Sequence, residues 1–331
     1  MKANDLEECD EMSKMHAVVV TQPGGPEVLT YCEVDKPVVK PGWSLIKVRG
    51  FGINHSEVFT RDGLSPTVHF PRILGIEVVG EIADSTLPEQ LPVGQTVLSF
   101  MGEMGRDYDG SYAEYVLLPN DQIYPVQTTL TWAELAAIPE TGYTAYGALL
   151  GLRLKAHDRL LIRGGTSGVG VTATKLAHAM AADVTVTSTT RRVGKSDQLK
   201  AVGVDEVLVG GEDPLPETAH FDKILDLIGP KTVKDSLQHL KPNGIVSSTG
   251  ELGGQWNLED FEPIAAIPNN CYLTSFYSGD VDRQVLQALL DLIATKKVDM
   301  TPTRVFSLPE VAAAHRQIES IHGFGKLVVV I

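Results

Sequence analysis

The chain has 331 residues, of which 43% are hydrophobic and 21% are charged. This length suits two domains, and the composition excludes disordered, fibrous and membrane-spanning proteins. Because 28 Lys and Arg stand against 42 Asp and Glu, the net charge of −14 opposes nucleic acid or membrane lipid as a partner.

Cysteine usage and the opening stretch bear on the cellular setting. The three cysteines, Cys9, Cys32 and Cys271, are too few and too widely spaced for a disulfide framework or a four-cysteine zinc lobe. They favour a reducing, cytoplasmic protein. The acidic opening stretch contains no apolar core segment, so residues 1–14 are predicted to form a flexible leader.

Short β-rich segments separated by Gly and Pro run from Met15 to about residue 129 and predict a compact β-barrel-like unit. The candidate strands are 16–22, 29–35, 44–54, 73–83, 95–100 and 111–119.

From about residue 130, helices alternate with short apolar strands of the kind that a parallel sheet buries on both faces. The candidate strands are 159–163, 183–188, 205–210, 222–229, 243–250 and 271–278, and helices are expected at 171–182, 232–240 and 285–294. This repeated βαβ pattern predicts a doubly wound sheet. The tail at 304–308 and 326–331 is β-type again. The predicted domains are therefore a β domain of residues 15–129 and 297–331, interrupted by a βαβ domain of residues 130–296.

A glycine-rich turn, RGGTSGVG at 163–170, lies between the first parallel strand and its helix. Its spacing, Gly165, Gly168 and Gly170, is GxxGxG and differs from the usual GxGxxG. Glycines at such a turn let backbone N–H groups approach a pyrophosphate at the positive end of the helix. The context of strand, turn and helix predicts dinucleotide binding.

The end of the second parallel strand indicates which cofactor is bound. An acidic residue there would bond the ribose 2′-hydroxyl of NAD, but this strand ends at Ser188 and is followed by Arg191 and Arg192. Arginine matches phosphate oxygens, so we predict NADPH. The alternative is a solvated loop with two surface charges.

Several motifs in order resemble the zinc-independent quinone oxidoreductase branch of the medium-chain dehydrogenase/reductase superfamily, over nearly all of residues 15–331. They are GGPEVLTY, GINHSEVFTRDG (52–63), FPRILGIEVVG (70–80), AAIPETGYTAYGAL (136–149), RGGTSGVG, FDKILDLIG, LKPNGIVSSTG and the terminal GKLVVV. The resemblance implies a GroES-like β-barrel catalytic domain interrupted by a Rossmann domain, with the cofactor in the cleft between them.

The resemblance also implies site residues. Asn54, His55 and Phe59 are expected at the substrate. For the cofactor, the expected residues are Thr144, Gly165, Thr166, Ser167, Gly168, Val169, Ser188, Arg191, Arg192, Gly250 and Phe276. Other interpretations stay open: Asn54 could close a turn, His55 could be structural, and Phe59 and Phe276 could be packing residues. Relatives often have proline in place of His55, and the tyrosine they carry near GLSP is absent here.

No metal is expected. Zinc-dependent relatives use a Cys and a His at the places where this chain has Asn54 and Ile76, and neither residue is a good zinc ligand. Glu77, beside the missing histidine, is expected to bond backbone or an arginine. Without a metal to polarise a carbonyl, the acceptor must already be electrophilic.

The predicted function is therefore NADPH-dependent reduction of a quinone. The alternatives are reduction of an activated C=C bond in an enone, alkenal or enoyl thioester, and a sensor that binds NADPH without turnover. A short-chain dehydrogenase is disfavoured because no YxxxK follows the turn. The segment 271–278 is expected at a sheet edge, which favours a homodimer.

Overall fold

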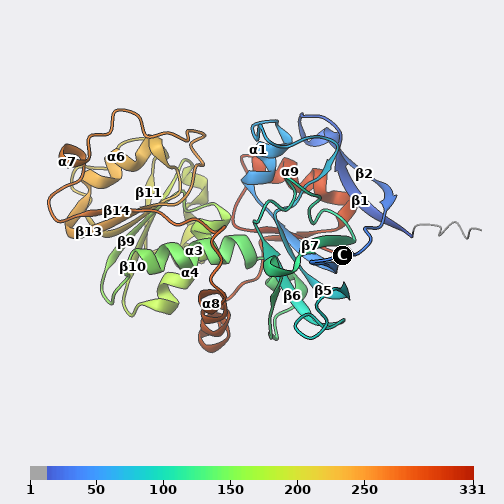
Figure 1. Cartoon of the computed structure of the whole chain (residues 1–331). Helices are drawn as coiled ribbons and strands as arrows, with labels where there is room; N and C mark the ends of the chain where they lie inside the picture. Colours follow the sequence, from blue (N-terminus) through green and yellow to red (C-terminus); the bar gives the residue numbers. More distant parts are fainter. Residues whose placement is uncertain (1–12) are drawn as a thin grey trace, which may run out of the picture.

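The computed structural model describes residues 13–331, which form a β-rich half and a half built on a parallel sheet (Figure 1). Residues 1–12 of the predicted leader, including Cys9, lie outside the described residues. The first strand already includes Lys14, the last residue assigned to that leader.

Two sheets make up the β-rich half. The three-stranded sheet has the order β2-β1-β4, with β1 Lys14–Val20, β2 Leu29–Asp35 and β4 Arg72–Ile73. The seven-stranded sheet has the order β15-β16-β3-β5-β6-β8, and its seventh strand β7 pairs with β3. Its bounds are β3 Trp43–Ile53, β5 Glu77–Ser85, β6 Thr96–Phe100, β7 Tyr115–Pro119, β8 Tyr124–Pro125, β15 Arg304–Phe306 and β16 Leu327–Val330.

The return of the tail to the β-rich half is confirmed by strand pairing. β16 lies antiparallel to β3, with Leu327 opposite Ile53 and Val330 opposite Gly50. Side chains of these strands share one buried apolar core with β1 and β5. The last apolar run of the sequence, β16, therefore completes this sheet together with its neighbour β15. All other strands of the sheet lie more than 170 residues earlier in the chain.

The second half is a six-stranded parallel sheet with the order β11-β10-β9-β12-β13-β14. Its bounds are β9 Arg159–Arg163, β10 Thr185–Thr190, β11 Glu206–Val209, β12 Phe221–Asp226, β13 Leu240–Ser248 and β14 Tyr272–Thr274. The apolar centre of β9 is fully buried because helices cover both faces of the sheet. This confirms the predicted doubly wound arrangement, with β14 at an edge.

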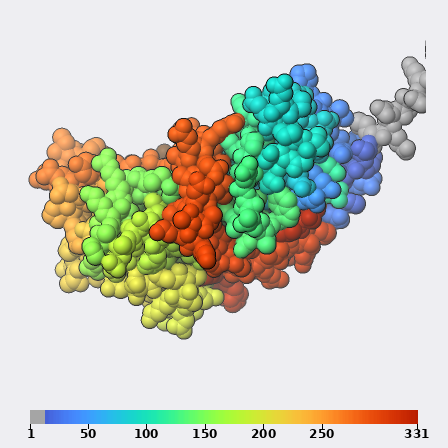
Figure 2. All heavy atoms as spheres, turned by 90° about the horizontal axis from the view of Figure 1, so that it is seen from below, coloured from blue at the N-terminus to red at the C-terminus, as the bar shows by residue number. Residues whose placement is uncertain are grey.

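The covering helices fall into two groups (Figure 1). On one face lie α3 Pro139–Gly151, α4 Gly168–Met180 and α8 Arg283–Lys296, which pack on one another. On the other face lie α6 Pro230–Gln238 and α7 Pro263–Ala266, and α5 Ser196–Ala201 contacts β11. Viewed from below, the orange-red segment that includes α8 lies between the two halves (Figure 2).

Three short helices belong to the β-rich half or join it to the sheet: α1 His55–Arg61, α2 Trp132–Leu135 and α9 Val311–Glu319. Helix α1 is held by Arg61, whose fully buried guanidinium donates twice to the Glu319 carboxylate of α9, at 2.9 Å each. Charge-assisted bonds of this kind are stronger than neutral ones. They fix α1 against the C-terminal part of the chain.

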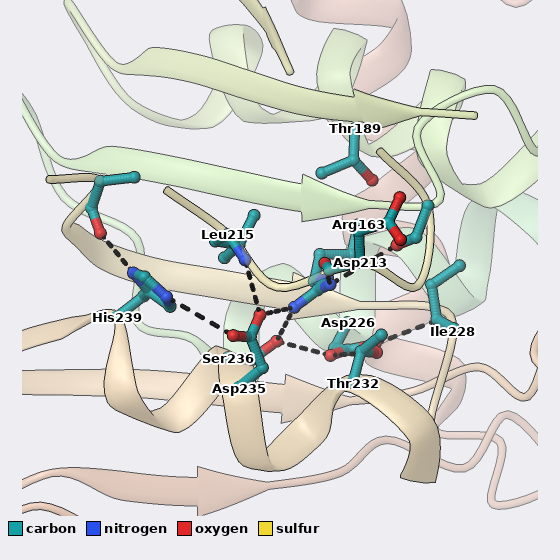
Figure 3. A network of polar contacts seen from close by, with 12 residues as sticks. Arg163, Thr189, Asp213, Leu215, Asp226, Ile228, Thr232, Asp235, Ser236 and His239 are labelled. Carbon is teal, nitrogen blue, oxygen red and sulfur yellow. Dashed lines mark hydrogen bonds and ion pairs between the residues drawn. The ribbon is translucent and has the colours of Figure 1, made fainter. Parts of the chain in front are cut away.

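A buried polar network secures the carboxyl ends of β9 and β12 (Figure 3). Arg163, the last residue of β9, donates to Asp235 of α6 at 2.5 Å and to the Asp213 carbonyl at 2.9 Å. Asp226, the last residue of β12, accepts from the Thr232 and Ser236 hydroxyls of α6. Arg163 is thus used in holding the fold, although it begins the glycine-rich motif.

Candidate functional site

The glycine-rich turn begins helix α4. Ser167 is the N-cap, and its hydroxyl accepts the Gly170 N–H at 3.1 Å. Glycine is needed at Gly165, where a Cβ would lie 1.5 Å from the Ser188 hydroxyl oxygen, and at Gly170, where it would lie 2.6 Å from the Gly164 carbonyl oxygen. These two glycines therefore serve chain packing at the turn.

The start of α4 offers donors to an anion. Within residues 13–331, the N–H groups of Gly168 and Val169 have no acceptor, and a Cβ at Gly168 would meet nothing closer than 3.5 Å. Unpaired N–H groups at the positive end of a helix suit a phosphate. The turn also meets the returning tail, because the Gly325 N–H donates to the Thr166 carbonyl at 2.9 Å. The residues present therefore fit a dinucleotide pyrophosphate.

Beyond β10, three basic side chains gather. Arg191 and Arg192 are exposed, and Lys195 follows them in a short 3-10 helix. Burial and then the charges of Arg192 and Arg191 lower the pKa of Lys195. No carboxylate of residues 13–331 forms an ion pair with any of the three. Lys195 was not among the expected cofactor residues, although it lies only three residues beyond Arg192.

The other expected cofactor residues differ in how accessible they are. Ser188 is fully buried, and its hydroxyl donates to the Ile162 carbonyl. Phe276 packs against Gly147 of α3 so closely that a Cβ there would lie 2.0 Å from the ring. Gly250 lies against the Leu227 carbonyl oxygen, 2.5 Å from its Cβ position. These contacts pack the chain around the turn, and the donor of the Ser188 hydroxyl is in use.

Asn54 lies at a junction where both halves meet. As N-cap of α1, it donates its Nδ2 to Glu77 at 2.8 Å and to Glu57 at 3.4 Å. Its Oδ1 accepts from Lys326 Nζ at 2.6 Å and from the Thr141 hydroxyl at 3.5 Å. All four hydrogen-bonding positions of the amide are therefore in use. The structure thus shows Asn54 bonded within the chain, and its contact with the substrate stays a prediction.

Lys326 is the cation of this junction. Its Nζ lies 2.6 Å from Glu77 Oε1, and the two side chains are 5% and 0% exposed. The second oxygen of Glu77 accepts the Glu140 N–H at 2.8 Å. Glu77 thus bonds backbone, as expected, and a lysine in place of the expected arginine. Lys326 belongs to no motif except the terminal GKLVVV. Its hydrogen-bond partners therefore became visible only in the folded structure.

Glu57 closes the junction on the α1 side. One of its oxygens accepts the Asn54 N–H at 3.1 Å, and the other accepts the Ile76 N–H at 3.2 Å. Burial, followed by the charge of Glu77, raises the pKa of Glu57 to about 7. The places where zinc-dependent relatives have ligands therefore hold a fully bonded amide, Asn54, and an apolar side chain, Ile76, which is 3% exposed.

Two aromatic side chains meet where α1 approaches the loop after β13. The rings of Phe59 and Trp256 have centroids 5.9 Å apart and cross at 71°, an edge-to-face pair. Phe59 is half-buried and Trp256 is 50% exposed. His55, one helical turn earlier, has its pKa lowered by burial, which favours the neutral ring. Trp256 was not foreseen, because nothing near it in sequence forms a motif.

Comparison with known families agrees with this architecture. Residues 40–128 match the alcohol dehydrogenase GroES-like domain, and residues 202–329 match the zinc-binding dehydrogenase model. The second match does not include positions 54 and 76. No helix of residues 13–331 combines the length and apolar character needed to cross a membrane.

Individual relatives cover almost the whole chain. The NAD(P)H oxidoreductase RTN4IP1 of Danio rerio, a mitochondrial protein, is 28% identical, with 95% of this chain and 91% of the relative covered. The quinone oxidoreductase of Pongo abelii is 28% identical over 94% of this chain and 95% of the relative. The mycobacterial Rv1454c structure, complexed with NADPH, superposes with a TM-score of 0.81 at 25% identity, covering 96% of this chain and all of the neighbour.

The family models, the relatives and the fold agree on the GroES-like and Rossmann-like halves. They place the chain among nicotinamide-dependent oxidoreductases. The chain therefore belongs to the medium-chain dehydrogenase/reductase superfamily, as a quinone oxidoreductase-like member.

Proposed function

We propose that this protein is an NADPH-dependent reductase that transfers hydride to a quinone and uses no zinc. The observation that carries this proposal is the environment of Asn54. Its Oδ1 is bonded to the Lys326 ammonium, and its Nδ2 is bonded to two carboxylates. A side chain so engaged has no free atom for a metal. An acceptor reduced without a metal must already be electrophilic, as a quinone is.

The preference for NADPH rests on the three cations beyond β10. Arg191, Arg192 and Lys195 have no carboxylate partner among the described residues, and a ribose 2′-phosphate would supply the missing negative charge. The N–H groups of Gly168 and Val169 would hold the pyrophosphate. When bound, NADPH supplies the hydride. The protein's own part is to bind and orient both reactants.

A flat, conjugated acceptor is supported by the aromatic pair of Phe59 and Trp256. Aromatic faces attract other π systems in offset or edge-to-face geometry, worth about 0.5–1.5 kcal/mol for each pair. Phe59 is the one expected substrate residue whose ring meets a residue of the other half. The name of the relative from Pongo abelii is also quinone oxidoreductase.

The test is to mix the purified protein with NADPH and a panel of quinones and enones, and to follow the nicotinamide absorbance. Oxidation of NADPH with quinones supports the proposal. Oxidation with enones alone would favour reduction of an activated C=C bond. Binding of NADPH without any turnover would favour a sensor and refute the enzyme. One tightly bound zinc per chain in a metal assay would refute the zinc-free mechanism.

We also propose a homodimer, and we keep residues 15–129 with 297–331, and residues 130–296, as the two domains. The edge strand β14 carries Tyr272, which is 51% exposed. An open strand edge is a ready surface for pairing with a second copy of the chain.

A further inference from the structure

Glu140 has surroundings that its role in α3 does not explain. It lies in the first turn of that helix. Its Oε1 accepts from the Ser278 hydroxyl at 2.9 Å and from the Thr144 hydroxyl at 3.2 Å. Its Oε2 is buried and has no partner among the described residues. An ionised oxygen in such a place would lose its hydration without any compensation, whereas a protonated oxygen would lose far less.

The charges that face Glu140 also favour the protonated form. The Glu77 carboxylate of β5 accepts the Glu140 N–H, and Asn54 Nδ2 donates to both Glu77 and Glu57 of α1. Lys326 is the only cation bonded to this group of three glutamates in the part of the chain that the structure describes. Burial, with Glu77 as the next cause, raises the pKa of Glu140 to about 7.

Glu57 provides a comparison within the same junction. Its pKa is raised to about 7 as well, but both of its oxygens accept hydrogen bonds from backbone N–H groups. In Glu140, one carboxyl oxygen accepts hydrogen bonds from two hydroxyl groups, and the other oxygen accepts no hydrogen bond. Of these two residues, only Glu140 therefore has a buried oxygen that is most simply explained as protonated.

Glu140 also lies beside the proposed cofactor site. The first turn of α3 faces the first turn of α4, since Thr141 Cγ2 is 3.5 Å from the Cβ position of Gly168. Thr144, which donates to Glu140, is expected near the nicotinamide or the phosphates of the cofactor. If the nicotinamide lies at Thr144, a change in its charge would act on Glu140 through one hydrogen-bonded neighbour. This step rests on the proposed function.

We propose that Glu140 stores the proton of the reaction: it would hold the proton while the bound nicotinamide is reduced and uncharged, and would release it when the bound nicotinamide is oxidised and cationic. In each turnover the acceptor gains one hydride from the dihydronicotinamide and one proton. The O–H bond of Glu140 breaks and leaves its electron pair on the carboxylate. The proton goes to the reduced acceptor, and Glu140 regains one from solvent before the next turnover.

The physical basis is the effect of a nearby cation on a carboxyl group. An opposite charge within about 4–6 Å lowers a carboxyl pKa by roughly 1–3 units. The same hydroxyls of Thr144 and Ser278 that bond Oε1 would stabilise the carboxylate. Oxidation of the cofactor and delivery of the proton are then linked in one place.

The link between cofactor oxidation and the Glu140 proton is tested by measuring proton release when the cofactor binds, with no quinone present. NADP⁺ and NADPH are each added to the full chain in weak buffer near pH 6.5, with an indicator dye. Both cofactors carry the same phosphates, so the difference between them reports the ring charge. We expect NADP⁺ to release roughly half to one proton more per chain than NADPH. This difference should shrink above pH 8, where Glu140 is already ionised in both complexes.

Variants of Glu140 and Glu57 test which carboxyl group releases the proton. The Glu140→Gln variant keeps the size of the side chain and should lose the difference, whereas Glu140→Asp keeps a carboxyl and should retain part of it. The Glu57→Gln variant removes the other carboxyl of the junction whose pKa is raised to about 7, and most of the difference should remain because Glu140 is still present. Equal release by both cofactors in the unmodified chain, or a full difference in Glu140→Gln, would overturn the proposal. A chain that shows the difference but reduces no quinone would refute the proposed function and leave the proton store in place.

Discussion

The ion pair of Lys326 and Glu77 gives the sharpest prediction for stability. Replacing Lys326 by Met removes an ammonium that is 5% exposed and bonded to Asn54 and Glu77 at 2.6 Å each. Glu77, which is 0% exposed, then remains buried without its cation. Removing one partner of a buried pair costs about 3–5 kcal/mol. We expect Lys326→Met to lower the free energy of unfolding by that amount.

The double variant Lys326→Met/Glu77→Gln separates the energy of the ion pair from the effects of changed packing. If Glu77 is also changed to Gln, no unpaired charge is left behind, so the double variant should lose much less than the two single losses added together. An interaction energy of at least about 2 kcal/mol is expected from such a cycle. The assay is urea unfolding followed by circular dichroism at pH 7.

An exposed pair supplies the control. Lys175 and Asp299 also form an ion pair, at 2.9 Å, but Asp299 is 66% exposed. Lys175→Met should therefore cost only about 0–1 kcal/mol. Strictly additive losses for Lys326→Met and Glu77→Gln, or a loss for Lys326→Met no larger than that of Lys175→Met, would refute the reasoning.

Other side chains give separate tests. Arg191→Ala/Arg192→Ala should weaken NADPH binding by at least about tenfold in a fluorescence titration and spare NADH, since charge-assisted bonds contribute about 1.5–3 kcal/mol each; equal weakening of both would contradict the phosphate site. The folded chain holds the Glu57 proton more tightly than the unfolded chain, so its contribution to stability is full below pH 4.5 and is lost as pH rises through about 7. Urea unfolding should show this loss, on the order of 3 kcal/mol for this group, and Glu57→Gln should remove it; a pH dependence unchanged by the variant would contradict it. In Trp43→Phe/Trp132→Phe, the remaining fluorescence of Trp256 should be quenched by a bound quinone; unchanged emission would place the acceptor elsewhere. Light scattering should give twice 35.8 kDa for the homodimer, and a single-chain mass would exclude it.

Most strands and the parallel sheet could be predicted from the sequence because their signals are local. Apolar runs such as 159–163 are bounded by turn residues, and the structure has strand β9 at those same residues. The glycine-rich turn was equally visible, since strand, glycines and helix follow one another directly. Helix α1 was not foreseen, because its seven residues are too few to show a helical period beside the long strand before them.

The junction around Asn54 could not be predicted in the same way. Its members come from α1, β5, α3 and the lead into β16, so Asn54 and Lys326 are 272 residues apart in the chain. A single sequence shows each residue type but not which polar atoms are already paired. For that reason the hydrogen bonds of Asn54 and the unpaired oxygen of Glu140 could not be seen before the fold was known.

The contact between Gly325 and Thr166 has a consequence for how the protein can be divided. The lead into β16 bonds the phosphate-binding turn and, one residue later, places the Lys326 ammonium between Asn54 and Glu77. Neither half expressed by itself would contain this arrangement. During synthesis, both the turn and the junction must wait for the same few residues, which emerge after the whole parallel sheet. A ribosome-bound chain that stops short of Lys326 would therefore have its nucleotide turn without the strand that braces it.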